Sequence, residues 1–322
     1  MNILILSAGT RNKIVQFFKK ELEGKGKVVA TDCSELAPAL YDADKHYIVP
    51  RIDDPNYIDA ILDICKKENI KGLFSLIDPE LSLLAENKNK FLKEGIVPIV
   101  SDYDTVEMSL NKMKMHDFCI ANGINTIKSY DNLADFKKAL GNREIDFPVF
   151  VKPICGSCSN QIQKVEDIEE LEFIFKRYDG LMIQELMTGY EIGADVYIDL
   201  ISKEIVSIFT KKKLLMRAGE TDKSVSFKDE KLFEFIENFV KKAGFIGQID
   251  IDIYKKDGEY LISEVNPRFG GGYPHAYACG CDFTKHVVNN LKGIENKEEI
   301  GKYQEKIYMM KYLDMKIKEE IQ

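Results

Sequence analysis

The chain is most informative at residues 247–272, which read GQIDIDIYKKDGEYLISEVNPRFGGG. Polar and apolar residues alternate on both sides of Asp257-Gly258, and this alternation has the period of a half-buried strand. The dipeptide itself favours a tight turn between antiparallel strands. The stretch therefore predicts a β-hairpin that ends in a proline, an arginine and three glycines.

One face of this hairpin is predicted to carry several acidic side chains. Asp250 and Asp252 alternate with isoleucines, and Glu264 and Asn266 alternate likewise on the second strand. Carboxylates that lie this close repel one another, so a positive charge between them would stabilise the face. Oxygen ligands of this kind suit Mg²⁺, which takes one or two carboxylates and completes its shell with water and phosphate oxygens. A solvated acidic surface is the other interpretation, and for Asp252 the two are equally good.

The register of the hairpin determines whether the acids of this metal site lie on one face. If Asp257-Gly258 were a plain two-residue turn, Asp250 would oppose Val265, and Glu264 would face the other way. A shared face therefore requires a longer loop or a β-bulge, and we expect one. Beyond the strand, Arg268 is suited to bind a phosphoryl group with two hydrogen bonds.

A second polar segment, residues 149–162, reads VFVKPICGSCSNQI. Lys152 ends an apolar strand, and Gly156, Ser157 and Ser159 follow in a loop of small residues. Such a loop can present backbone N–H groups and hydroxyls to a phosphate, although it lacks the sequence of a P-loop. Taken alone, an exposed lysine at a strand end is the simpler interpretation.

The order of the motifs favours a nucleotide site. Lys112 opens a predicted helix before this loop, residues 184–187 (QELM) end a strand, and Glu191 follows ahead of the hairpin. This arrangement resembles the ATP-grasp superfamily, and most of all proteins related to the large subunit of carbamoyl phosphate synthase. The resemblance covers nearly the whole chain, and residues 263–268 (SEVNPR) are its most specific part.

The resemblance implies a role for individual residues. It implies that ATP is bound by Lys112, Lys152, Gly156, Ser157, Ser159, Gln184, Glu185, Leu186, Met187 and Glu191. Within that set the lysines contact the phosphates, the loop from Gly156 closes over them as a lid, residues 184–187 form the adenine hinge, and Glu191 binds the ribose. Magnesium or manganese is held by Asp250, Glu264 and Asn266, although relatives often carry Gln at the first position. Arg268 stabilises the transferring phosphoryl group.

The resemblance also implies a reaction. ATP-grasp enzymes join a carboxylate to an amine or thiol through an acylphosphate, with release of ADP and phosphate. We expect small-molecule carboxylate and amine substrates, with Arg217, Gly271 and His275 as candidate contacts, and an amino-acid or peptide-type ligase. The length leaves no room for the duplicated halves of carbamoyl phosphate synthase, so we expect no carbamoyl phosphate synthesis. The alternative is an ATP-binding regulatory or scaffold module without ligase turnover.

Three units are predicted along the chain. Strands alternate with helices over the first hundred residues, which predicts a Rossmann-like parallel sheet in an α/β domain at residues 1–105. An α+β ATP-grasp fold of two subdomains would follow. Its small subdomain with the phosphate lid is expected at 106–187, and a C-terminal antiparallel-sheet subdomain at 188–322. Within these units we expect Asp131 to cap a helix over 131–140. Residues 211–224 are polar and basic, and a mobile charged loop there is the alternative to a substrate role for Arg217.

Composition excludes other classes of protein. The chain has 45 basic and 53 acidic residues, and this net charge of −8 opposes binding to nucleic acid or an anionic membrane. No apolar run approaches the ~20 residues that a membrane-spanning helix needs. Seven unclustered cysteines suit a reducing compartment, so we expect a cytoplasmic protein. A homodimer is the default expectation for its assembly.

Overall fold

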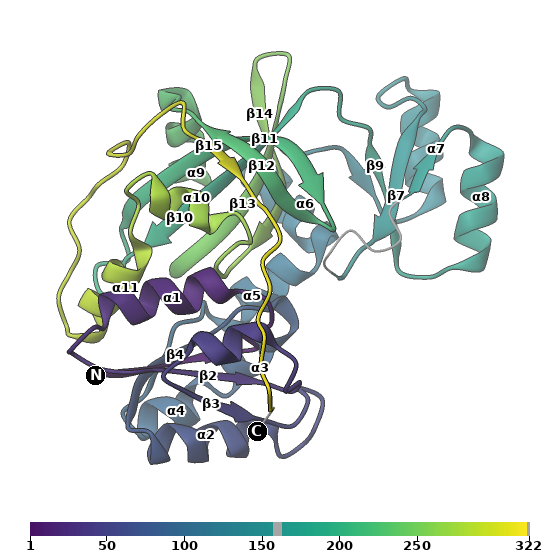
Figure 1. The fold of residues 1–322 in the computed structure, drawn as a ribbon. Coiled ribbons are helices and arrows are strands. Elements are labelled where there is room, and N and C mark those ends of the chain that lie inside the picture. Colours follow the sequence, from purple (N-terminus) through teal and green to yellow (C-terminus); the bar gives the residue numbers. More distant parts are fainter. Residues whose placement is uncertain (157–162, 321–322) are drawn as a thin grey trace.

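The structure, a computed structural model, describes residues 1–156 and 163–320. Over these residues the strands form three sheets, each built from a consecutive part of the chain (Figure 1). No helix in this part of the chain combines the length and the apolar content needed to cross a membrane. The predicted boundaries of the three units stay predictions, because strand membership alone does not define where a folding unit ends.

The first sheet is entirely parallel and runs in the order β3-β2-β1-β4-β5. Its strands are β1 (Asn2–Leu6), β2 (Val28–Asp32), β3 (Lys45–Ile48), β4 (Ile70–Ser75) and β5 (Val97–Pro98). The helices between them are α1 (Asn12–Glu21), α2 (Tyr57–Lys67), α3 (Asp78–Glu86) and α4 (Lys88–Lys93), with a 3₁₀ turn at Pro38–Asp42. The predicted Rossmann-like sheet is therefore confirmed. The chain turns at Asn87, which separates α3 from α4.

The continuous apolar run of β1 is explained by burial on both faces of the sheet. Ile3 and Ile5 pack into one core, whereas Leu4 and Leu6 pack into another beneath α2 and α3. Alternate side chains of a strand point to opposite faces, so a parallel strand between two layers needs an apolar residue at every position. The core that contains Ile3 also contains residues of the C-terminal sheet, so the two units share it.

The second sheet is smaller and antiparallel, in the order β6-β9-β7-β8. It comprises β6 (Ser129–Tyr130), β7 (Val149–Pro153), β8 (Gln163–Val165) and β9 (Leu181–Glu185), with α7 (Leu133–Gly141) and α8 (Ile168–Arg177). Helices α5 (Tyr103–Leu110) and α6 (Lys112–Ala121) connect it to the first sheet. The expected cap of α7 was wrong by one residue: Asn132, not Asp131, accepts the N–H of Asp135.

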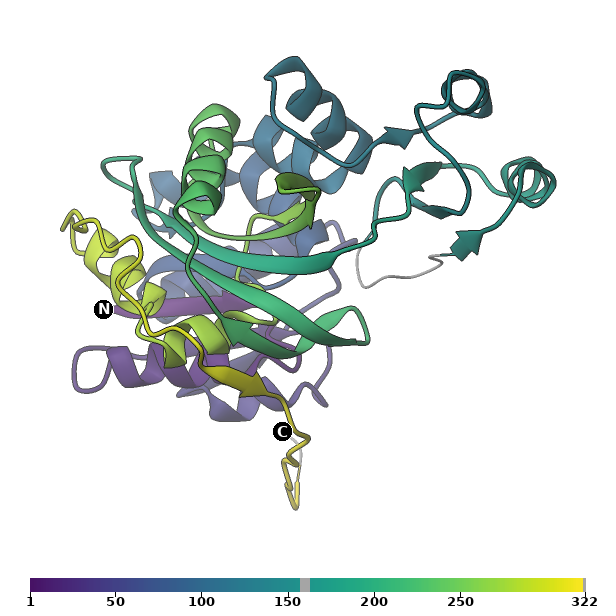
Figure 2. The same cartoon turned by 90° about the horizontal axis from the view of Figure 1, so that it is seen from above.

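The third sheet is antiparallel and has the order β14-β13-β10-β11-β12-β15. Its strands are β10 (Tyr190–Ile198), β11 (Ile205–Arg217), β12 (Glu220–Ser226), β13 (Gly247–Lys256), β14 (Glu259–Asn266) and β15 (Tyr308–Met310); its helices are α9 (Glu230–Ala243), α10 (Tyr273–Ala278) and α11 (Phe283–Leu291). Seen from above, long strands of this sheet cross the molecule toward the small sheet (Figure 2). Residues 211–224 do not form the charged loop that was one alternative for this segment, because they pair as the β11–β12 hairpin.

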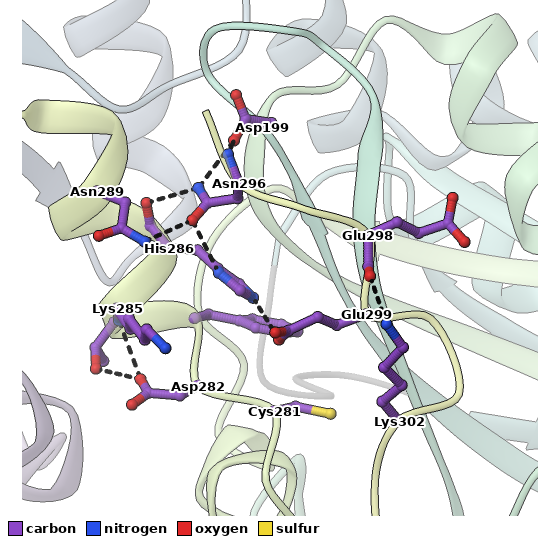
Figure 3. A network of polar contacts seen from close by, with 12 residues as sticks. Asp199, Cys281, Asp282, Lys285, His286, Asn289, Asn296, Glu298, Glu299 and Lys302 are labelled. Carbon is purple, nitrogen blue, oxygen red and sulfur yellow. Dashed lines mark hydrogen bonds and ion pairs between the residues drawn. The ribbon is translucent and has the colours of Figure 1, made fainter. Parts of the chain in front are cut away.

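A buried polar network holds the segment after α11 against the third sheet (Figure 3). Asp199, at the end of β10, accepts hydrogen bonds from Asn290 Nδ2 at 2.7 Å and from the backbone and side-chain nitrogens of Asn296 at 2.9 and 2.8 Å. Asn296 Oδ1 in turn accepts from Asn289 Nδ2 and lies 3.2 Å from His286 Nδ1. This network fixes the route by which the chain returns to form β15.

Candidate active site

A cavity of about 580 Å³ is lined by residues of the second and third sheets and by Arg11 of the first unit. Most of the residues predicted for the site line it: Lys112, Lys152, Gly156, Gln184, Glu185, Met187, Glu191, Asp250, Glu264, Asn266, Arg268 and Gly271. They come from strands and loops that lie up to about 160 positions apart in the chain, so only the tertiary fold brings them together. The cavity is within the size range of small-molecule and cofactor sites in proteins.

The β13–β14 hairpin directs its acids into this cavity because it contains a β-bulge. The turn is the tight two-residue type, with φ of +52° at Asp257 and +88° at Gly258. Asp252 pairs with Glu264 but Ile253 pairs with Ile262, so Ser263 is the extra residue of the second strand. This shift places Asp250 opposite Asn266 and gives the shared face. The bulge expected from the sequence is therefore present.

The acidic face has the properties of a cation site. Burial raises the pKa of Asp250 and of Glu264, although nearby lysines lower both. The protein's own cations thus compensate these carboxylates incompletely, and a bound divalent cation would complete the compensation. Among the described residues, no three His, Cys, Asp or Glu side chains gather tightly enough to hold a metal. A cation here would need Asn266 and phosphate oxygens as ligands besides the acids. Mg²⁺ is commonly coordinated in this way, by one or two carboxylates together with phosphate oxygens.

Two lysines face these acids across the cavity. Lys152 ends β7 and is 8% exposed; burial lowers the pKa of its ammonium, whereas Glu264 raises it. Lys112 opens α6, and its Nζ donates to the carbonyl of Gly156 at 2.7 Å. The side chain of Asn111 caps α6 by accepting from two backbone N–H groups, which fixes the position of Lys112. Both lysines can therefore reach an anion bound over the loop after β7.

Around the end of β9 the cavity is lined by both apolar and polar side chains. Ile127, Phe150 and Met187 line it. Gln184 Nε2 donates to Ser129 Oγ at 3.0 Å, and Glu185 pairs with Lys256 at 2.5 Å. A flat, mostly apolar ring with polar edges suits this part of the cavity.

Lys213, which was not predicted from the sequence, forms ion pairs with two of the acids. Its ammonium lies 2.6 Å from Glu191 and 2.5 Å from Asp252, and its side chain is only 5% exposed. Burial lowers the pKa of Lys213, but Asp252 and Glu191 raise it further and keep the lysine charged. Asp252 therefore faces the site rather than bulk solvent. The available signal was the alternation of Lys211 and Lys213, which a strand places on one face.

A second missed residue, Asp78, holds Arg268. The guanidinium Nη2 of Arg268 donates to Asp78 at 2.6 Å and to Asn266 Oδ1 at 3.2 Å, and Nη1 donates to the carbonyl of Phe269 at 3.2 Å. Asp78 is the first residue of α3, in the first unit. Three acceptors thus set the direction of the guanidinium plane at the wall of the cavity.

The three glycines after Arg268 lie against charged side chains. A side chain at Gly270 would collide with the carboxylate of Asp250. A Cβ at Gly271 would lie 2.6 Å from Glu220 Oε2 and 2.7 Å from Arg11 Nη1. Arg11 and Glu220 also line the cavity, and neither was singled out from the sequence. The glycines allow the backbone to approach these groups closely.

Comparison with known proteins identifies the domains that surround this cavity. Residues 132–272 match the ATP-grasp domain family, and residues 3–100 match the family described as PylC-like, N-terminal domain. Residues 132–272 therefore resemble an ATP-grasp domain, and the predicted relation to ATP-grasp proteins and to carbamoyl phosphate synthase is confirmed.

Individual relatives are distant. The chain is 28% identical to a carbamoyl-phosphate synthase of Methanobrevibacter smithii over 52% of its own length and 45% of that protein. It is 25% identical to a formate-dependent phosphoribosylglycinamide formyltransferase of Prochlorococcus marinus over 83% of its length and 69% of that protein. The chain thus spans less than half of the first relative and about two thirds of the second.

A solved structure shows the same ATP-grasp fold. It is the biotin carboxylase domain of 2-oxoglutarate carboxylase from Hydrogenobacter thermophilus, in complex with MgADP, ADP and bicarbonate. The TM-score is 0.75 at 18% identity, and the match covers 95% of this chain and 73% of that one. At this identity the likeness establishes the fold, and the predicted combination of α/β and ATP-grasp units is confirmed.

Some predicted residues lie outside the ATP-grasp cavity. Arg217 is 62% exposed near the β11–β12 turn, 3.6 Å from Asp222. His275 is buried, with Nδ1 2.8 Å from Ser224 Oγ and Nε2 3.0 Å from the carbonyl of Ile307. Leu186 is absent from the cavity lining in the part of the chain described here. The ligand roles of these three residues stay predictions, and Ser157 and Ser159 lie outside the described residues.

Proposed function

We propose that the chain is an ATP- and Mg²⁺-dependent ligase that joins a carboxylate to an amine or thiol through an acylphosphate, with release of ADP and phosphate. The observation that carries the proposal is the convergence of Lys112 and Lys152 with Glu264, Asn266 and Arg268 on one cavity. Phosphoryl transfer needs positioning and charge neutralisation more than it needs a protein nucleophile, and this set supplies both.

The residues divide by position into those that bind the nucleotide and those that face the reacting phosphoryl group. Gln184, Glu185 and Met187 would contact the adenine, and Glu191, which also lines the cavity, would bind a ribose hydroxyl. Lys152 and Lys112 would bind the phosphate oxygens, because each presents an ammonium group at the end of β7. The predicted lid from Gly156 continues into residues outside the described part of the chain.

The acidic face would hold the metal. Asp250, Glu264 and Asn266 provide the oxygens, and bound Mg²⁺ would neutralise charge on the phosphates. Arg268 is held by Asp78 and Asn266, and this leaves its guanidinium at the cavity wall, where it can stabilise the transferring phosphoryl group.

The test is an ADP-release screen that crosses a set of carboxylates with a set of amines and thiols. Glu264→Gln should lower turnover at least ~10²-fold, since removal of a charged group that stabilises a phosphoryl transition state costs a few kcal/mol. Glu172→Gln is the matched control, because Glu172 pairs with Lys137 on the surface and is 50% exposed. Binding of MgATP without ADP release in any combination would instead identify a regulatory or scaffold module. Full activity of Glu264→Gln would refute the metal assignment.

A further inference from the structure

One part of the cavity is lined by the first unit and β12 rather than by the small sheet. Arg11 follows β1, where Gly9 turns the chain and donates its N–H to Asp32 at 2.9 Å. In the sheet order β3-β2-β1-β4-β5, β1 is the strand from which successive connections run to opposite sides. Ligands of open parallel sheets bind beyond the carboxyl ends of the strands at this point. Arg11 therefore emerges where the fold favours a ligand contact.

Next to Arg11 the cavity wall carries one positive group, the Arg11 guanidinium, and one negative group, the Glu220 carboxylate. The guanidinium of Arg11 pairs with Glu220 Oε1, and the other oxygen of Glu220 lies 2.8 Å from Lys311 Nζ. The side chains of Arg11 and Glu220 remain 21% and 34% exposed, so a ligand in the cavity can reach both. Burial raises the pKa of Glu220, but Arg11 and Lys311 together lower it below its usual value and keep the carboxylate ionised.

The pair also lies beside the acidic face. A Cβ at Gly271 would collide with both Arg11 and Glu220, and a Cβ at the preceding Gly270 would collide with Asp250. Consecutive Cα atoms are about 3.8 Å apart, so a ligand held by the pair lies next to the side chains assigned to the metal. A substrate bound here would be within reach of the phosphoryl group that the proposed reaction transfers.

We propose that Arg11 and Glu220 bind a free α-amino acid, with its carboxylate on Arg11 and its ammonium on Glu220. This inference rests on the proposed ligase and names one of its substrate classes. A buried charge needs an opposite partner, and an α-amino acid carries both of its charges on a single carbon. The bound amino acid would replace the Arg11–Glu220 ion pair with two new pairs, carboxylate to Arg11 and ammonium to Glu220. The Lys311–Glu220 pair would remain. A simple amine on Glu220 would leave Arg11 without a partner, and a simple carboxylate on Arg11 would leave Glu220 with Lys311 alone.

The experiment uses the full chain with MgATP and the twenty common L-α-amino acids, crossed with carboxylates and amines. Each active amino acid is compared with its analogue lacking the amino group and with its analogue lacking the carboxylate. We expect either analogue to lose at least about tenfold in kcat/KM, the usual effect of losing one charged hydrogen bond. Arg11→Gln should raise KM for the amino acid by a similar factor and remove the preference over the decarboxylated analogue. Glu220→Gln should remove the preference over the desamino analogue.

Controls separate recognition from folding. Arg51→Gln removes a surface arginine that is 75% exposed and pairs with Asp53, and it should leave KM unchanged. If Arg11 and Glu220 only clamp the first unit to β12, both variants will lower the melting temperature and leave KM and analogue preference unchanged; that result overturns the inference. ADP release that requires no α-amino acid overturns it too, while the proposed ligase stands.

A binding measurement covers the case in which the ligase proposal fails. If no combination releases ADP, the melting temperature is measured with each amino acid and a non-hydrolysable ATP analogue. Stabilisation of the wild type that is lost in Arg11→Gln supports the amino-acid site. The absence of stabilisation by any amino acid overturns it.

Discussion

Single side chains at the site are held by buried ion pairs. Lys211 pairs with Asp195 behind Gly272, and Lys213 bridges Glu191 and Asp252. Burial raises the pKa of Asp195 to about 6, with Lys211 opposing the rise. Removing one partner from such a pair leaves an uncompensated buried charge, which is far more costly than losing a surface pair. The β11 lysines therefore maintain the acidic face before any cation binds.

His275 should make stability depend on pH. Burial, aided by Lys211, lowers the pKa of its imidazole to about 4. The unfolded chain, with a His pKa of about 6.5, therefore takes up the proton first as the pH falls. Stability is complete above pH 6.5 and declines toward pH 4, by about 2 kcal/mol between pH 7 and pH 5. Urea denaturation at these two pH values should show a smaller decline for His275→Gln. Equal declines in the two proteins would contradict this assignment.

At the level of elements, a single extra residue in β14 determines the site. The bulge at Ser263 reverses the faces of the strand between Ile262 and Glu264, so that Glu264 joins Asp250 and Asp252. Without it, the tight Asp257-Gly258 turn would send Glu264 to the opposite face of the sheet. The two-residue turn by itself would place Glu264 and Asp252 on opposite faces of the sheet. The bulge shifts the register by one residue, and both side chains then lie on the acidic face.

Asp199 should anchor the return of the chain from α11 to β15. Besides its bonds to Asn290 and Asn296, it accepts the backbone N–H groups of Ile201 and Ser202 at 2.8 and 3.0 Å. Asp199→Asn replaces one accepting carboxylate oxygen with an NH₂ group, which cannot accept the N–H groups that face it. We expect a loss of about 3 kcal/mol in the free energy of unfolding. Asp102→Asn, at an exposed pair with Lys88, should cost less than about 1 kcal/mol.

Urea denaturation of the two variants would check the difference. Burial raises the pKa of Asp199, but the hydrogen bonds from Asn290 and Asn296 lower it below 3.8. Its contribution is therefore present above pH 3.8 and is lost as the pH falls through the lower native pKa. An Asp199→Asn protein as stable as Asp102→Asn at pH 7 would show that the network carries no stability.

At the level of the molecule, the first unit and the third sheet are packed as one body. Phe18 and Phe74 of the first unit and Phe269 after β14 lie with ring centroids 5.0 to 5.8 Å apart. This shared core places Arg11 at the cavity and Asp78 against Arg268, which lines it. The first unit therefore supplies charged residues to the site rather than only covering it.

Asp78→Asn should lower ADP release through Arg268. The change removes the charge that orients the guanidinium, and we expect about a tenfold loss of kcat with little change in melting temperature. In an Arg268→Ala background the same substitution should cost nothing further, because residues that act through one another are not additive. Steady-state kinetics of the two single variants and the double variant provide the measurement. Additive losses would show that Asp78 acts independently of Arg268.

Local patterns in the chain were enough to predict the parallel sheet, the hairpin and the order of the nucleotide-binding motifs. The period of two in residues 247–266 is visible without neighbours, because strand geometry alone assigns its faces. The need for a bulge also followed from counting residues around Asp257-Gly258. These features depend on interactions within short stretches of chain.

Only long-range packing brings Arg11, Lys213 and Glu220 to the cavity, and Asp78 to the Arg268 that lines it. Asp78 meets a partner 190 positions away, and Arg11 meets one 209 positions away. The polar composition of residues 211–224 indicates a loop when its charges are assumed to need water, yet Lys211 and Lys213 are buried because acids on β10 and β13 neutralise them. Periodicity within a segment carries no information about such partners, since their pairing energy exists only after the sheets have assembled.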